Sequence, residues 1–147
     1  MTKLKIALLF LIITASTAAF ACDCVVYTIE QIIPITEVII RGRFISVENN
    51  PFPLMPGEKE EDRLYYEGRI IVTEVLKGEK IKVGDTITVK SDYSDCSVYY
   101  KMSKEYLFFA SKRDNGIESD GCSFTTEYDA IGKNDWYQET KKLLEKK

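Results

Sequence analysis

Hydrophobic residues in this chain occur in short stretches that alternate with polar positions or run together for a few residues. Such stretches are typical of β-strands, and the glycine, proline, asparagine and aspartate residues between them favour turns. Gly42 indicates a bulge or bend in the first stretch, and Asp114-Asn115-Gly116 predicts a hairpin between the last two. The pattern predicts five strands, at about residues 37–47, 64–76, 86–89, 106–110 and 117–124.

A short helix is predicted before the first strand. Thr28 followed three residues later by Gln31 matches a capping box, in which each side chain bonds the backbone of the other residue. The helix is expected to span about residues 29–33 and to end at Pro34, because proline lacks the backbone N–H that a continuing helix needs.

A second helix is predicted near the C-terminal end, where Asn134-Asp135 can cap a helix over about residues 136–145. Five strands with only two helices favour a mostly β fold. We expect a five-stranded OB-like Greek-key barrel with a short N-terminal helix and a C-terminal helix. A seven-stranded sandwich requires more strand than this pattern provides. Helical periodicity predicts one shared face on the last helix, formed by Trp136, Thr140, Leu143 and Leu144.

Residues 1–21 are typical of a secretory signal peptide. Lys3 and Lys5 precede an unbroken apolar run at residues 6–13, and Ala19-Phe20-Ala21 has the small-x-small pattern of a cleavage site. The apolar run is too short to form a permanent membrane span. Cleavage after Ala21 leaves a mature chain of residues 22–147, which we expect to form one domain in the periplasm or the extracellular space.

Cleavage also makes Cys22 the first mature residue, with a free α-amino group and a thiol. A cysteine at this position permits lipidation as well, which would anchor the protein to a membrane through Cys22. Ala19 stands where a lipoprotein normally has a Leu-like residue, and Phe20 where it normally has a small one. The sequence therefore favours simple secretion, with a lipid anchor at Cys22 as the alternative.

Composition restricts the partners and the chemistry. Without Lys3 and Lys5, the mature chain has 18 basic and 23 acidic residues, a net charge of −5. We therefore expect no nucleic-acid partner, no membrane contact unless Cys22 is lipidated, and a monomer. The chain contains no histidine, which excludes Ser-His-Asp and Cys-His catalysis and the usual zinc ligands. The expectation is a protein that is not an enzyme and has no cofactor or metal of its own.

The four cysteines are Cys22, Cys24, Cys96 and Cys122. An even number in an oxidising compartment predicts two disulfides. A bond between Cys22 and Cys24 is disfavoured because the ring is too tight for relaxed geometry. Two pairings are left: Cys22–Cys96 with Cys24–Cys122, or the crossed alternative. A redox role for Cys22-x-Cys24 requires a thiol of low pKa, and no nearby basic residue indicates one.

Several stretches resemble one known family. They are Cys22-Asp23-Cys24, residues 38–44 (VIIRGRF), 72–78 (VTEVLKG) and 84–89 (GDTITV), Cys96 ahead of Tyr106-Leu107, and Gly121-Cys122-Ser123. Together they resemble the N-terminal inhibitory domain of tissue inhibitors of metalloproteinases, and more closely the bacterial relatives of these inhibitors in the netrin-like (NTR) group. The resemblance spans nearly the whole mature chain. It implies the pairing Cys22–Cys96 and Cys24–Cys122.

The resemblance also implies a mechanism and a partner. The partner is a zinc metalloprotease, whose catalytic zinc keeps one coordination position open. The α-amine and the carbonyl oxygen of Cys22 would chelate that zinc, and the clamped segment Cys22-Asp23-Cys24 would form the inhibitory site. In the family, the residue between the two cysteines is usually small or hydroxylated and enters the specificity pocket of the protease. Asp23 departs from this pattern, because its side chain is a charged carboxylate. Burying that carboxylate in the pocket costs several kcal/mol unless the pocket supplies a cation.

A second function fits the same sequence. Cys22-x-Cys24 can simply staple the first strand of a secreted barrel that binds another ligand through its loops. In this alternative the protein is a non-inhibitory binding or interaction module. Exposed aromatic residues favour interfaces, and six aromatic residues are candidates for such a face: Phe52, Tyr65, Tyr66, Tyr93, Tyr99 and Tyr100. The same residues also fit a barrel core.

Overall fold

The computed structural model describes residues 24–25, 27–48, 56–57, 59, 63–91, 97–128 and 135–146. The predicted signal peptide at residues 1–21, together with Cys22, Asp23 and Cys96, lies outside these ranges. The elements in chain order are α2 (Ile29–Ile35), β1 (Val38–Val47), β2 (Glu67–Lys77), β3 (Thr86–Ser91), β4 (Glu105–Arg113), β5 (Gly116–Ser119), β6 (Thr126–Glu127) and α3 (Asp135–Glu145).

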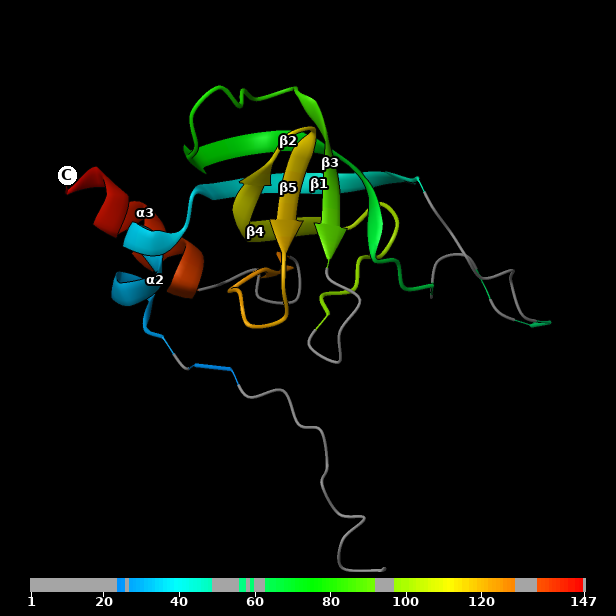
Figure 1. Ribbon diagram of the computed structural model, residues 1–147, viewed down its shortest axis with the longest axis horizontal. Coiled ribbons are helices and arrows are strands. Elements are labelled where there is room, and N and C mark those ends of the chain that lie inside the picture. Colours follow the sequence, from blue (N-terminus) through cyan, green and yellow to red (C-terminus); the bar gives the residue numbers. More distant parts are fainter. Residues whose placement is uncertain are drawn as a thin grey trace, which may run out of the picture.

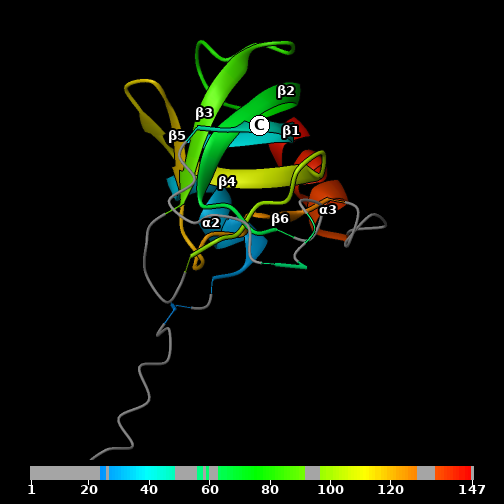
Figure 2. The ribbon, with the colours of Figure 1, turned by 90° about the vertical axis from the view of Figure 1, so that its right-hand side faces the viewer.

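Strands β1 to β5 form a closed barrel (Figures 1 and 2). The sheet order is β1-β2-β3-β5-β4-β6, and β1 pairs with β4 to complete the circle. All pairings are antiparallel except that of β3 with β5, which is parallel. The predicted mostly β fold, with five barrel strands, a short N-terminal helix and a C-terminal helix, is confirmed.

The barrel interior is filled by alternate residues of the strands, as the period of two requires. On β1, Ile40 and Phe44 point inward and are fully buried, and the rings of Tyr65 and Tyr100 stack on Phe44. Burying one side chain of this size contributes about 1.5–3 kcal/mol. The predicted irregularity at Gly42 is confirmed, because the β1–β2 register shifts between Arg41 and Gly42.

A second apolar cluster lies outside the barrel. Ile39, Leu107 and Phe109 point outward from β1 and β4, yet all three are fully or almost fully buried. The two helices α2 and α3 cover this face, and Figure 1 shows them on the same side of the barrel. The barrel is therefore covered on one side by the segment that follows Cys24 and by the C-terminal helix.

The helix α2 extends past the predicted stop at Pro34 to Ile35. In so short a helix the missing N–H of proline removes only one bond, so the turn can still close. Thr36 completes the end, because both its backbone N–H and its hydroxyl donate to the carbonyl of Ile32, at 3.0 and 2.8 Å. The predicted capping box of Thr28 and Gln31 is confirmed.

Some strand limits also differ from the prediction. β2 begins at Glu67, and Tyr65 before it forms only an isolated bridge with Tyr100. β5 ends at Ser119, so Cys122 lies in a turn and not in a strand. The turn forms because the Asp120 carboxylate accepts a hydrogen bond from the backbone N–H of Cys122, at 2.9 Å. This local bond replaces the sheet bonds that a longer strand would make.

The residues of the predicted α3 face are buried to different depths. Trp136 is 41% exposed, whereas Tyr137 is only 8% exposed and Thr140 is fully buried. Leu143 and Leu144 pack partly against the outer cluster, as expected. The helix is turned so that Tyr137 contacts the barrel, while Trp136 lies at the edge against Phe124, with 5.1 Å between ring centroids.

Candidate functional site

One end of the barrel gathers the segments that the sequence singled out. We call it the disulfide end; it comprises the C-terminal ends of β3 and β5 and the turn that contains Cys122. Ser91 and Ser119 pair in the parallel register of these strands, so both strands finish at the same level. Cys122 follows Ser119 by three residues, and residues 92–96 follow Ser91. Ser91, which precedes this segment in sequence, therefore lies at the same end of the barrel as Cys122.

A disulfide joins Cys24 to Cys122, with 5.3 Å between their Cα atoms and a sequence separation of 98. This bond confirms one of the two predicted bridges and excludes the crossed pairing. Cys22–Cys96 is the pairing that is left, and both of its residues lie outside the described ranges. A disulfide of this kind is stable in an oxidising compartment, so it indicates an extracytoplasmic location.

The residues after Cys24 present apolar side chains at the surface. Val25 is 65% exposed and Tyr27 is 37% exposed, and Ile35 on α2 is 62% exposed. A shallow hollow of about 230 Å³ lies between α2 and the ends of β4 and β5, and Tyr27, Ile35 and Cys122 are among its lining residues. Tyr27 and Ile35 therefore expose apolar surface around the same hollow that Cys122 lines.

The predicted tyrosine face divides into core and surface residues. Tyr65 and Tyr100 are buried in the barrel, so they belong to the core. Tyr66 and Tyr99 form a pair nearer the surface, with ring centroids 4.8 Å apart and hydroxyls 3.2 Å apart. This pair lies at the disulfide end, because the N–H of Ser91 donates to the carbonyl of Tyr66 at 2.7 Å. Phe52 and Tyr93 lie outside the described ranges.

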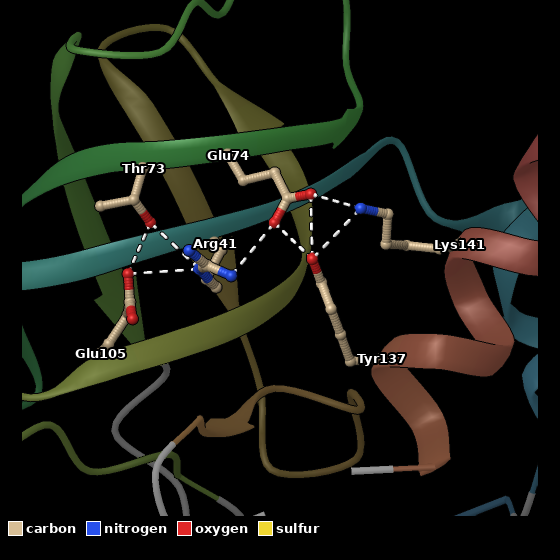
Figure 3. Close-up of polar contacts among 6 residues, drawn as sticks. All are labelled: Arg41, Thr73, Glu74, Glu105, Tyr137 and Lys141. Carbon is tan, nitrogen blue, oxygen red and sulfur yellow. Dashed lines mark hydrogen bonds and ion pairs between the residues drawn. The ribbon is translucent and has the colours of Figure 1, made fainter. Parts of the chain in front are cut away.

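A second group of polar residues lies where α3 meets the barrel (Figure 3). We call it the Arg41 cluster. The guanidinium of Arg41 lies 3.2 Å from a carboxylate oxygen of Glu74 and 3.2 Å from one of Glu105. Glu74 also accepts hydrogen bonds from the hydroxyl of Tyr137, at 2.7 Å, and from the ammonium of Lys141, at 3.1 Å. The cluster therefore links β1, β2 and β4 to the C-terminal helix.

The charges in the Arg41 cluster stabilise one another. Partial burial opposes ionisation of Glu74, but hydrogen bonds from Tyr137 and Lys141 and the charges of Lys141 and Arg41 lower its pKa. Burial and the carboxylate of Glu74 raise the pKa of the Tyr137 hydroxyl. Partial burial disfavours the Arg41 cation, but the neighbouring carboxylates Glu105 and Glu74 raise its pKa. These shifts keep Glu74 ionised and Tyr137 neutral at pH 7.

The Arg41 cluster is suited to holding the helix and not to catalysis. An acid–base catalyst needs a pKa near the working pH, and the pKa of Glu74 is shifted away from neutrality. Sequence inspection did not find the cluster, because Arg41, Glu74 and Tyr137 lie on three distant segments. The one available signal was an arginine at an outward position of a strand that carries few polar residues.

A metal site needs a group of ligating side chains, and a membrane span needs a long apolar helix; both concern here the described ranges of the chain. Within those ranges, no three His, Cys, Asp or Glu residues lie close enough together to hold a metal ion. None of the helices that the structure describes is long and apolar enough to cross a membrane.

No protein-family model matches this sequence, and no curated protein is significantly similar to it. Fold and site geometry therefore define the class of protein. It is a small five-stranded barrel of the OB type whose N-terminal segment is bonded to the turn after β5.

Proposed function

We propose that this protein is a secreted inhibitor of zinc metalloproteases, similar to the bacterial relatives of tissue inhibitors of metalloproteinases in the netrin-like group. Its inhibitory group is the mature N-terminus, where the α-amine and carbonyl oxygen of Cys22 chelate the zinc of the target. The observation that carries the proposal is the Cys24–Cys122 bond. It fixes the chain two residues after the chelating group, on the barrel end where β3 finishes at Ser91, five residues before Cys96 in sequence.

The position of Cys24 restricts where Cys22 can lie. Cys24 is two residues from the proposed chelating group, and two extended residues span at most about 7 Å. The segment 92–96 begins at Ser91, which is at the same end. This proximity supports the second bridge, Cys22–Cys96. Two bridges would hold residues 22–24 rigid, and rigidity lowers the ordering entropy that is lost when the site docks.

The zinc chemistry is compatible with an N-terminal amine. A catalytic zinc has three protein ligands and one open position, which an amine and a carbonyl oxygen can occupy together as a five-membered chelate. Binding requires the neutral amine, and an α-amino pKa of about 7.7 makes its deprotonation on the metal easy. Val25 and Tyr27, which follow Cys24 in sequence, have exposed side chains that can supply apolar contact area.

Asp23 selects among targets. Between the two cysteines it enters the specificity pocket of the protease, where an unpaired carboxylate costs several kcal/mol. The target that fits best is therefore a metalloprotease whose pocket carries a lysine or arginine. Proteases with purely apolar pockets should bind weakly and should bind an Asp23→Ser variant more tightly.

The test compares two forms of the secreted protein, one that begins at Cys22 and one with a single alanine added before it. Intact mass and N-terminal sequencing first establish the start of the chain, the bridges and the absence of lipid. The inhibition constant is then measured against a panel of metalloproteases with apolar and basic pockets. The added alanine displaces the amine from the zinc, so we expect a loss of at least about 100-fold.

A matched control adds the same alanine after Lys147, where it should change nothing. The proposal is wrong if the form that begins at Cys22 inhibits no member of the panel, or if the extended form inhibits equally well. It is also wrong if native material starts elsewhere or carries lipid on Cys22.

The alternative function is a secreted, non-inhibitory binding module. The observation that favours it is the surface pair Tyr66 and Tyr99 at the disulfide end, which an interface can use without a chelating amine. Such a module would bind its partner equally well with and without the added alanine. It would instead lose affinity when Tyr99, which is 42% exposed, is replaced by alanine.

A further inference from the structure

Lys77 closes the C-terminal end of α2. It is the last residue of β2, and its ammonium lies 2.7 Å from the carbonyl oxygen of Ile33, 3.3 Å from that of Pro34 and 2.5 Å from that of Thr36. The last carbonyls of a helix have no partner within the helix, and they form the negative end of its dipole. One ammonium group therefore satisfies the end of α2 and ties it to the barrel.

Lys77 fixes the orientation of α2 on the barrel, which the apolar contacts of the helix alone leave poorly determined. Three isoleucines of α2, Ile29, Ile32 and Ile33, pack on the outer cluster. Hydrophobic contact is non-directional, so a short strip of isoleucines permits several helix orientations. A helix of seven residues also has little stability of its own. An ammonium group bound by three carbonyls favours a single orientation.

The segment between Cys24 and α2 is consequently held from both sides. Cys24 is bonded to Cys122, and α2 begins at Ile29, so only residues 25–28 lie between the two anchors. A disulfide fixes one point of a chain but leaves open the direction in which the chain passes through it. The second anchor, α2, supplies that direction.

We infer that Lys77 is a positioning residue for the N-terminal site: by fixing α2 it sets the direction in which the chain passes through Cys24. It acts through α2 and not by contact with the partner. The effect on inhibition rests on the proposed function. The effect on the order of Val25 and Tyr27 does not, so the two can be tested separately.

The test uses Lys77→Met, which keeps the length and apolar stem of the side chain and removes its charge and donors. The control is Lys90→Met on β3, a strand that does not pack against α2 and whose lysine pairs with Glu67 at 4.0 Å. Backbone ¹⁵N relaxation gives order parameters for Val25 and Tyr27. We expect values near about 0.85 in the unaltered protein and below about 0.6 in Lys77→Met, with Lys90→Met unchanged.

The same samples are assayed for inhibition of a metalloprotease that the unaltered protein inhibits. Misplacement of the amine by a fraction of an ångström should weaken inhibition by Lys77→Met about tenfold or more. Amide exchange of the barrel strands shows whether the barrel is intact. If Lys77→Met unfolds it, Lys77→Gln, which keeps a donor without charge, replaces it in both measurements.

Unchanged order parameters at Val25 and Tyr27 in a folded Lys77 variant would overturn the inference, whatever the inhibition data show. If the unaltered protein inhibits no protease while these order parameters fall as expected, the proposed function fails and the positioning role of Lys77 stands. Loss of order without any change in a measurable inhibition constant would refute the functional role of Lys77.

Discussion

Glu74 receives more polar contacts than its strand position suggests. Its carboxylate accepts hydrogen bonds from Tyr137 and Lys141 and forms an ion pair with Arg41. These contacts join β1 and α3 to β2, and the carboxylate is only partly exposed. A group that is charged, partly buried and fully partnered contributes to stability mainly through what its loss would leave unpaired.

The stabilisation by Glu74 should depend on pH. The pKa of Glu74 is lower in the folded protein than the ordinary value of a glutamate, because Tyr137, Lys141 and Arg41 stabilise the carboxylate against the opposing effect of burial. Its contribution is therefore present at neutral pH and is lost as the pH falls through the folded value. We expect Glu74→Gln to reduce the free energy of unfolding by about 1 kcal/mol at pH 7 and by much less at pH 3.

Urea denaturation at both pH values measures this difference. Glu48→Gln is the control, because Glu48 forms a longer and more exposed ion pair with Arg69, at 3.7 Å. A Glu74→Gln cost that is equal at pH 7 and pH 3 would contradict the assignment.

At the scale of elements, the two helices depend on the barrel face between them. α2 and α3 both pack on Ile39, Leu107 and Phe109, and neither covers this face alone. The hydroxyl of Tyr137 reaches Glu74 while its ring packs in the outer cluster. Tyr137 thus couples the apolar contact of α3 to its polar one.

The packing of α3 predicts effects of different size for two adjacent aromatic residues. Tyr137→Ala removes a nearly buried ring and should lower the free energy of unfolding by about 2–4 kcal/mol. Trp136→Ala removes a larger but 41% exposed ring and should cost about 1 kcal/mol. Thermal or urea unfolding of the two variants gives the comparison. A greater cost for Trp136→Ala would mean that α3 is rotated relative to this structure.

The same elements show what the sequence could and could not predict. Alternation of apolar residues is local, so the five barrel strands and the capping box at Thr28 were predictable. The end of β5 was missed because a side-chain bond from Asp120 competes with the sheet, which residue patterns do not reveal. Tyr137 was missed because more than one face of α3 contains apolar residues. Only packing against the barrel determines which of these faces is buried. The Arg41 cluster depends on tertiary contacts throughout, and the N-terminal site was indicated by its cysteine spacing.

At the scale of the whole molecule, the Cys24–Cys122 bond connects the first described residue to the turn after β5. It closes a loop of 98 residues, which includes the whole barrel. A cross-link over so long a loop restricts the unfolded chain strongly, nominally by about 4–5 kcal/mol in the chain-entropy model. The bond therefore contributes both to the stability of the fold and to the position of the N-terminal segment.

Removing this bond should destabilise the protein globally. The double variant Cys24→Ser with Cys122→Ser is expected to lower the free energy of unfolding by about 2–5 kcal/mol. Equilibrium urea denaturation, followed by tyrosine fluorescence, measures the change. A change below about 0.5 kcal/mol would mean that the unfolded chain is already restricted in another way.

The parallel pairing of β3 with β5 has a consequence for biogenesis. β5 lies between β3 and β4, so the barrel cannot close until β5, its last strand in sequence, has joined the sheet. If the chain emerges from an export channel N-terminus first, Cys24 reaches the oxidising side long before Cys122. The thiol of Cys24 then has no partner until Cys122 has been translocated. The order of translocation, and not thiol chemistry, therefore sets the earliest moment at which this disulfide can form.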